Sequence, residues 1–333
     1  MNQITALTWA RTKEYYRDKG SLLWSFVLPP LIIAVVALAF SREDGHLFKV
    51  GYYPGEQAPT VLNSLNYVQK VPFSNEEEAV RKVRHHQIDL LLYTDGNHRF
   101  LYNPDSHNAR VLQDLINASP TQAWQGEVAE GRRVRYVDWV IPGILAMNMM
   151  FSGLFGVGYV IVRYRKNGVL KRLQAAPVSP AAFLCAQMLS RLIIMLAVSV
   201  IVYTASDWFL DFLMLGSYLN LLLVAALGNL CILSLGLIVA SRLANEELAN
   251  GLLNFLTFPM LLLSEVWFSL DGAPEWMSDA SQLLPLTHMV QAARAIMIEG
   301  GGLADISHHL IAMALMTTVF LGLAARLFKW RAD

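Results

Sequence analysis

The sequence predicts an α-helical polytopic membrane protein with six transmembrane helices and a small α/β domain between the first and the second of them. Hydrophobic residues make up 55% of the 333 residues and charged residues only 16%, which is outside the balance typical of soluble domains. Several uncharged stretches reach the roughly 20 residues that a helix needs to cross a bilayer. A polar stretch of short elements, residues 41–136, interrupts them.

Residues 1–21 alternate apolar side chains with basic ones such as Arg11, and this pattern predicts a cytoplasmic interfacial amphipathic helix. Residues 22–40 carry no charge and predict the first transmembrane helix, with a kink at Pro29 and Pro30. A cleaved signal peptide is the alternative for this stretch, but the stretch is longer than a typical signal core.

The remaining residues, 137–333, hold five further predicted spans, at residues 137–162, 181–205, 212–240, 252–270 and 309–327. Lys and Arg gather before the first span, after the second and at the C-terminus, whereas the opposite short loops are mainly acidic. Because basic loops stay in the cytoplasm, we expect both termini on that side. Lys plus Arg equal Asp plus Glu at 26 each, so no global basic field exists to bind nucleic acid.

Residues 271–300, between the last two spans, contain a short apolar piece that carries Pro285, His288 and Arg294. This piece is too short and too polar to cross a bilayer. We therefore expect a reentrant helical pair before the last span.

The polar stretch 41–136 predicts an extracytoplasmic α/β domain. A TDGN sequence at 94–97 is a strong hairpin signal, and a helix capped by Ser74 or Asn75 precedes it. The expected elements are strands at 48–53, 88–94 and 98–103, a helix at 75–87, and a polar helical arm at 105–129 broken at Pro120. The histidines of this domain lack a ligand spacing and predict surface residues, not a metal site: His85, His86, His98 and His107.

The chain lacks the motifs of nucleotide binding and of hydrolysis, namely G-x-x-x-x-G-K-[ST], G-x-G-x-x-G, H-E-x-x-H and G-x-S-x-G. We therefore expect no catalytic, cofactor-binding or metal-binding residues and no ATP hydrolysis by this chain. Charges inside the spans are scarce: Arg191 lies within the third span and Glu265 near the outer end of the fifth. Arg191 fits a side chain that extends toward the cytoplasmic interface.

The loop 163–180 is basic, and Gly168 separates an extension of the second span from a short helix that ends before Pro177. Val169, Leu170 and Leu173 form the apolar side of this short helix. Such a helix is either a docking surface for a cytoplasmic partner or an anchor on lipid headgroups.

The order of these features resembles the permease subunit of type 2 ABC transporters, a family of exporters whose six-span membrane subunit works with a separate ATPase. The likeness rests on YVDWVIPG at 136–143, on the loop that follows the second span, and on the run 254–294. The matching positions in the loop are Arg165, Gly168, Leu173, Pro177 and Ser179. The chain departs from the family at Lys166 and Lys171, where acids are common, at Val169 and Ala176, where threonine is common, and at Glu265 and Ser269, where glycine and proline are usual.

The resemblance implies a location in the bacterial cytoplasmic (inner) membrane, a homodimer or heterodimer of permeases, and two ABC ATPase subunits that hold the ATP and Mg. It assigns ATPase coupling to Arg165, Gly168, Val169, Leu170, Leu173 and Pro177. It assigns the translocation path and gate to Asn148, Ser152, Asn254, Thr257, Ser264, Glu265 and Phe268, with ordinary helix packing as the alternative. A path rich in Met and Phe fits an amphipathic or lipid-like substrate or a drug. A periplasmic partner stays open.

Two other classes of protein remain as alternatives. An ion-coupled secondary carrier explains the spans, but it has to work without ATP and to depend on Arg191 or Glu265. A membrane sensor or scaffold explains the outside domain and the basic loop, but it does not need six spans.

Overall fold

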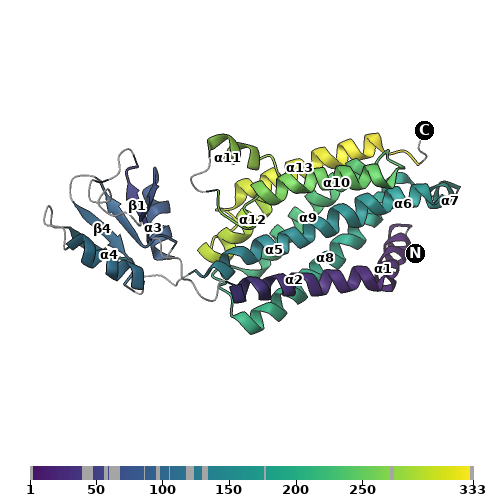
Figure 1. The fold of residues 1–333 in the computed structure, drawn as a ribbon. Coiled ribbons are helices and arrows are strands. Elements are labelled where there is room, and N and C mark those ends of the chain that lie inside the picture. The colour runs from purple at the N-terminus through teal and green to yellow at the C-terminus, as the bar shows by residue number, and fades with distance from the viewer. Residues whose placement is uncertain are drawn as a thin grey trace. The chain divides into compact units, whose positions relative to one another are not determined.

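The computed structural model describes residues 3–39, 48–55, 59, 68–85, 87–94, 98–104, 106–117, 124–129, 134–175, 178–270 and 274–330. These residues form two compact units (Figure 1). The helical unit comprises Met1–Ala39 and Val137–Asp333, and the α/β unit comprises Phe40–Tyr136.

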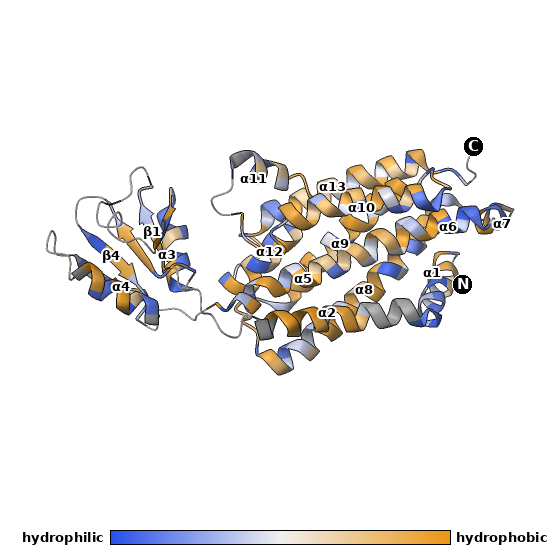
Figure 2. Cartoon of the chain, viewed as in Figure 1, coloured by the Kyte–Doolittle hydropathy of each residue, from blue (hydrophilic) through white to orange (hydrophobic). Residues whose placement is uncertain are grey.

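The helical unit contains the long apolar helices of the chain. Its elements are α1 (Gln3–Arg17), α2 (Lys19–Ala39), α5 (Tyr136–Gly153), the π-helical η2 (Leu154–Tyr159), α6 (Val160–Lys166), α7 (Val169–Ala175), α8 (Pro180–Leu210), α9 (Tyr218–Ala240), α10 (Glu246–Leu263), α11 (Glu275–Ser281), α12 (Pro285–Glu299) and α13 (Ser307–Leu327). Figure 2 shows hydrophobic residues along the length of these helices and hydrophilic residues on α1 and around α6 and α7.

Within the described residues, four helical stretches are long and apolar enough to cross a membrane: Tyr136–Lys166, Pro180–Leu210, Tyr218–Ala240 and Ser307–Leu327. This finding confirms a helical membrane protein and four of the predicted spans. Helices α2 and α10 occupy the places of the first and fifth predicted spans. The apolar stretch described in α2 covers only Ser25–Val36, and α10 has 18 residues and opens on two glutamates, so their crossing stays a prediction.

Three predicted helix boundaries are wrong by six or seven residues, one of them because the fifth helix begins at Glu246 and not at 252. The fourth span begins at Tyr218 and not at 212, because Asp211 adopts a left-handed conformation (φ 46°) that ends α8 and the hydroxyl of Ser217 accepts a hydrogen bond from the Leu219 N–H to start α9. The fifth helix ends at Leu263 and not at 270, because Glu265 also has a positive φ of 54°.

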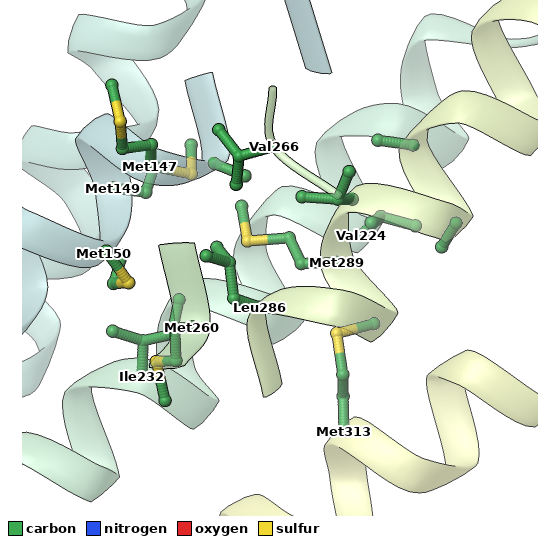
Figure 3. Packing of buried hydrophobic residues seen from close by; sticks show 14 of the residues in the cluster. Met147, Met149, Met150, Val224, Ile232, Met260, Val266, Leu286, Met289 and Met313 are labelled. Atoms are coloured by element: carbon green, nitrogen blue, oxygen red, sulfur yellow. The ribbon is translucent and has the colours of Figure 1, made fainter. Parts of the chain in front are cut away.

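Methionines dominate the core of the helical unit. Met149 and Met150 of α5 pack with Met260 of α10 and with Leu286 and Met289 of α12 (Figure 3). In a lipid environment such contacts stabilise by close packing and not by exclusion of water. Close backbone approach is visible at Gly143, where an added Cβ would lie 2.6 Å from the carbonyl oxygen of Val266.

The two ends of the helical unit differ. Helix α7, the start of α1 and the C-terminal end of α13 lie at one end, and α11 and α12 lie toward the other (Figure 1). The predicted reentrant pair thus corresponds to two short helices, α11 and α12, at the end opposite α7.

The α/β unit is a five-stranded sheet in the order β2-β1-β3-β4-β5. Strand β1 (Phe48–Tyr53) pairs in parallel with β2 (Val68–Pro72) and β3 (Leu90–Tyr93), β4 (Arg99–Tyr102) pairs antiparallel with β3, and β5 (Gln125–Val128) pairs in parallel with β4. Helix α3 (Glu76–Arg84) packs with Leu91 and Leu101 on one face, and α4 (His107–Asn117) packs with Leu90 and Leu92 on the other.

The expected strands and the helix with its Asn75 cap are confirmed, since Asn75 accepts a hydrogen bond from the Glu77 N–H at 2.9 Å. The expected helical arm at 105–129 is wrong in its second half. Helix α4 ends at Asn117 and Gln125–Val128 is an edge strand, whose four exposed residues give no alternating pattern. Residues 95–97 of the hairpin signal, His86 and Pro120 lie outside the described residues.

Candidate functional site

A cavity of about 1020 Å³ opens between α1, α2, α8 and the long helix formed by α5, η2 and α6. Two residues predicted for the translocation path, Asn148 and Ser152, line it together. Phe151, Phe155 and Arg191 also border it. The cavity lies at the π-helical segment η2, and such one-turn widenings of an α-helix are frequent at functional sites.

Helix α1 is attached to this cavity wall by its polar side chains. The guanidinium of Arg11 donates to the Tyr164 hydroxyl at 2.9 Å and to the Gly156 carbonyl at 3.1 Å. The hydroxyl of Thr12 lies 2.8 Å from that of Ser190 on α8. The amphipathic N-terminal segment is therefore a helix, as predicted, and it contacts the bundle directly.

Gly168 separates α6 from α7 with a φ of +71°. An added Cβ there would meet nothing within 4 Å. The requirement for glycine at this position therefore comes from the positive φ and not from steric crowding. Leu170 is fully buried in a cluster with Ile161 and Phe183, whereas Val169 and Leu173 are half-buried. Helix α7 is thus anchored by Leu170.

The outer face of α7 is basic. Lys171 and Arg172 are exposed, as are Gln174 and Ala175. This arrangement leaves a positive face at the end of the unit that also holds both described chain ends (Figure 1). The predicted coupling residue Pro177 lies outside the described residues.

Arg165, the first predicted coupling residue, is buried behind this face. Its guanidinium donates to the carbonyls of Ala240 at 2.8 Å, Ser241 at 2.9 Å and Lys329 at 2.9 Å, and also to that of Leu243. The C-terminal carbonyls of a helix have no partner within the helix and carry its negative dipole end. Arg165 therefore positions α6 against the end of α9.

The sequence did not suggest a second link at this end. Glu246 at the start of α10 forms an ion pair with Lys166 (3.4 Å) and accepts a hydrogen bond from the Tyr159 hydroxyl (2.8 Å). Lys166, which stands where the family commonly has an acid, is thus paired inside the chain. No local pattern announces a contact between residues 80 positions apart.

The predicted gate residues Ser264 and Glu265 lie in the turn after α10, where both form side-chain interactions. The Thr287 hydroxyl donates to the buried Ser264 hydroxyl at 2.9 Å. Glu265 forms an ion pair with Arg294 at 3.3 Å and accepts from the Leu270 N–H at 3.0 Å. The left-handed conformation of Glu265 explains why glycine is usual at this position of the family.

Arg294 completes this cluster from α12. Its Nε donates to the Trp139 carbonyl at 3.0 Å, and its guanidinium lies 3.5 Å from the centre of the Trp139 ring. The cluster joins the start of α5, the turn after α10 and α12. Phe268 beside it is exposed.

The other two predicted path residues lie on α10. Thr257 is buried and donates to the Leu253 carbonyl at 2.7 Å, whereas Asn254 is half-buried and donates to the Asn250 carbonyl at 2.9 Å. The structure therefore places the predicted path residues in three groups: the cavity, the α10 face and the turn after α10.

Long apolar helices with a basic helix at one end are typical of a membrane protein that presents a docking surface beside the bilayer. The chain belongs to the ABC-2 type transporter family, whose pattern matches residues 2–298. It is a permease subunit of an ABC exporter and is not itself an enzyme, as the sequence predicted. This membership decides against the carrier and scaffold alternatives.

Three relatives illustrate the likeness. The chain is 19% identical to the probable multidrug ABC transporter permease YbhS of Escherichia coli (strain K12) over 377 residues, which cover 99% of this chain and 98% of the relative. It is 22% identical to the probable multidrug ABC transporter permease YbhR of the same strain over 191 residues, 57% of this chain and 51% of the relative. It is 24% identical to the daunorubicin resistance ABC transporter permease protein DrrB1 of Streptomyces coeruleorubidus over 202 residues, which cover 58% of this chain and 69% of the relative.

Proposed function

We propose that this permease exports amphipathic or lipid-like compounds, drugs included, across a bacterial inner membrane. The observation that carries the proposal is the cavity at η2, which combines the apolar side chains of Leu28, Phe151 and Phe155 with the polar ones of Asn148 and Ser152. Mixed walls of this kind fit a compound with an apolar body and a polar end. The likeness to YbhS over nearly the whole chain, and to DrrB1, supports the same class of cargo.

The proposed topology has six membrane-crossing helices with both termini in the cytoplasm. Helix α2 and helix α10 supply the two spans beyond the four found by length and composition. The end with α7 carries the exposed bases Lys171 and Arg172, which favour the cytoplasmic side. The α/β unit and the α11–α12 pair then lie outside, with the latter as the reentrant pair.

Two ATPase subunits would dock at the end with α7, one on each permease. The exposed basic face of α7 is complementary to an acidic groove. Leu170, which packs against the bundle, would transmit the movement of the helix to α6 and α8. Such transmission requires that the ATPase bind α7 differently in its open and closed states.

A second permease would face α10. Leu248, Leu252, Phe255, Phe258 and Leu262 are exposed along one side of this helix. The polar residues Asn250 and Asn254 lie one turn apart at the border of this side, and amide side chains are costly against lipid tails. These residues support a central path between two permeases, of the same or of two kinds. The resemblance to both YbhS and YbhR supports a pair of sister chains.

The proposal is tested with inside-out vesicles that contain the permease and its ATPase. An amphipathic dye should accumulate upon addition of ATP, whereas the hydrophilic anion calcein should not. Replacing Phe155 by serine should reduce dye accumulation, while Leu315→Ala, an exposed apolar position on α13, serves as the matched control. ATP-driven accumulation of calcein without the dye would contradict the proposed cargo class.

A further inference from the structure

The cavity at η2 contains a buried cation that forms no ion pair with any described residue. Arg191 of α8 is only 9% exposed, yet among the described residues no carboxylate lies within ion-pair distance of it. Its Nε donates to the Ser152 carbonyl at 2.9 Å, and its guanidinium lies 4.9 Å from the centre of the Tyr15 ring. Within the described chain its two terminal nitrogens have no hydrogen-bond acceptor.

The two other buried arginines of the helical unit have acceptors for their guanidinium groups. Arg294 has the carboxylate of Glu265, and Arg165 has four backbone carbonyls. A buried guanidinium that lacks such partners is costly, because its hydration is lost without compensation. Arg191 thus differs from both in having donors left over.

Asn148 of α5 lines the same cavity and is a second residue with an unused donor among the described residues. Asn148 is 9% exposed, and its Nδ2 has no hydrogen-bond partner in the described part of the chain. Asn148 and Arg191 both line the cavity. Side chains of α5 and α8 with donors unused in the described chain therefore border one space, and a guanidinium selects a carboxylate or a phosphate.

The backbone leaves room for this guanidinium. A Cβ at Gly156 would lie 2.3 Å from three atoms of the Arg191 head group. Gly156 belongs to η2, and its carbonyl accepts from Arg11 of α1. The π-helical turn, the glycine and α1 together hold Arg191 at the cavity.

The other residues that line the cavity include charged and apolar side chains. Four arginines border the cavity, Arg11, Arg17, Arg163 and Arg191, against the two acids Glu14 and Asp18. Leu28, Phe151 and Phe155 supply apolar wall. The lining matches a molecule with an acidic head and an apolar tail.

We propose that the cavity between α1, η2 and α8 binds an anionic amphiphile, with its acidic head on Arg191 and Asn148 and its tail along Phe151 and Phe155. The inference rests on the proposed orientation, in which Arg17 and Arg163 of the cavity lining lie toward the cytoplasmic headgroups. Two sources share this chemistry: an anionic phospholipid of the inner leaflet and an acidic amphipathic cargo. The ligand thereby connects α5 and η2 with α8.

The test uses the permease purified with its ATPase in mild detergent, with native mass spectrometry to count bound molecules. After delipidation, the wild type is titrated with dioleoyl phosphatidylglycerol and with dioleoyl phosphatidylcholine. We expect a preference of about tenfold or more for phosphatidylglycerol, since hydrogen bonds to a charged group contribute at least this much. Equal retention of both lipids by the wild type overturns the proposal without any variant.

The variant Arg191→Gln should lose this preference, and Arg242→Gln should keep it. Arg242 is an exposed arginine at the same end that does not border the cavity, so it controls for the loss of one charge. Preserved preference in Arg191→Gln overturns the proposal. If this variant does not fold, Asn148→Asp, which places a negative charge beside the proposed head, should weaken phosphatidylglycerol retention.

Molecules extracted from the complex purified out of its own membrane identify the source. A phospholipid mass assigns the cavity to the leaflet, and an organic acid that is not a lipid assigns it to cargo. Absence of any anionic amphiphile together with no lipid preference overturns the inference. Dye accumulation in the same vesicles is scored separately, so failure of the lipid site and failure of the exporter function are distinguishable.

Discussion

The conformation of Gly168 gives the sharpest prediction about coupling. Its φ of +71° costs an L-residue about 1–2 kcal/mol, and its open surroundings add no clash. Gly168→Ala should therefore populate the observed α6–α7 arrangement several-fold less, whereas Gly168→Asn should stay near the wild type because asparagine tolerates this region. Gly168→Pro should be worst, since proline fixes φ near −65° and removes the N–H that donates to the Arg165 carbonyl at 3.2 Å.

The assay is the ratio of dye exported to ATP hydrolysed in vesicles of the permease with its ATPase. We expect the order wild type, Asn, Ala, Pro, with the proline variant hydrolysing ATP without export. Gly322→Ala on α13 is the matched control, because an added Cβ there also meets nothing within 4 Å and its backbone is helical. A proline variant that inserts normally and exports like the wild type would refute the reasoning.

Three further outcomes are expected. Glu265→Gln should lower the stability of the permease by about 1.5–3 kcal/mol, measured by thermal unfolding, because Arg294 loses its charged partner; an unchanged midpoint argues against the pair. Arg165→Ala should loosen the end of α9, seen as faster hydrogen exchange around Ala240, and unchanged exchange there contradicts its positioning role. Burial raises the pKa of Tyr93 to about 12, so the contribution of its neutral form to the free energy of unfolding is intact below pH 10 and is lost as the pH rises through 12. Tyr93→Phe should remove this loss from the stability measured as a function of pH. A variant that loses the same stability at alkaline pH contradicts the assignment.

Hydropathy predicted much of the fold. The long apolar stretches predicted α5, α8, α9 and α13, and the continuous apolar run around Leu90–Tyr93 predicted a buried strand. Strand β5 was not predicted because all four of its residues are exposed and show no alternation. The start of α9 was predicted six residues too early because Phe212 and Leu213 are apolar and buried although they are not helical.

The candidate site depends on contacts that sequence periodicity does not encode. Gly168 and Glu265 were singled out correctly as unusual positions, but only the structure shows that both have positive φ. Arg165 was expected at a partner surface and is buried against backbone carbonyls. The pairing of Lys166 with Glu246 and the isolation of Arg191 depend on tertiary packing, because the residues concerned are far apart in sequence.

The central claim is that the end with α7 couples this permease to an ATPase. The most direct measurement is purification of the chain from its own membrane, identification of what accompanies it, and vanadate-sensitive ATP hydrolysis by the complex. Leu173→Asp is compared with Leu173→Met, which changes the same half-buried position of α7 without adding a charge.

We predict a stoichiometric partner with a phosphate-binding loop, and ATP turnover coupled to export that is lost in Leu173→Asp and retained in Leu173→Met. An intact, correctly inserted chain without an ATPase, or a Leu173→Asp complex that exports like the wild type, would contradict the account.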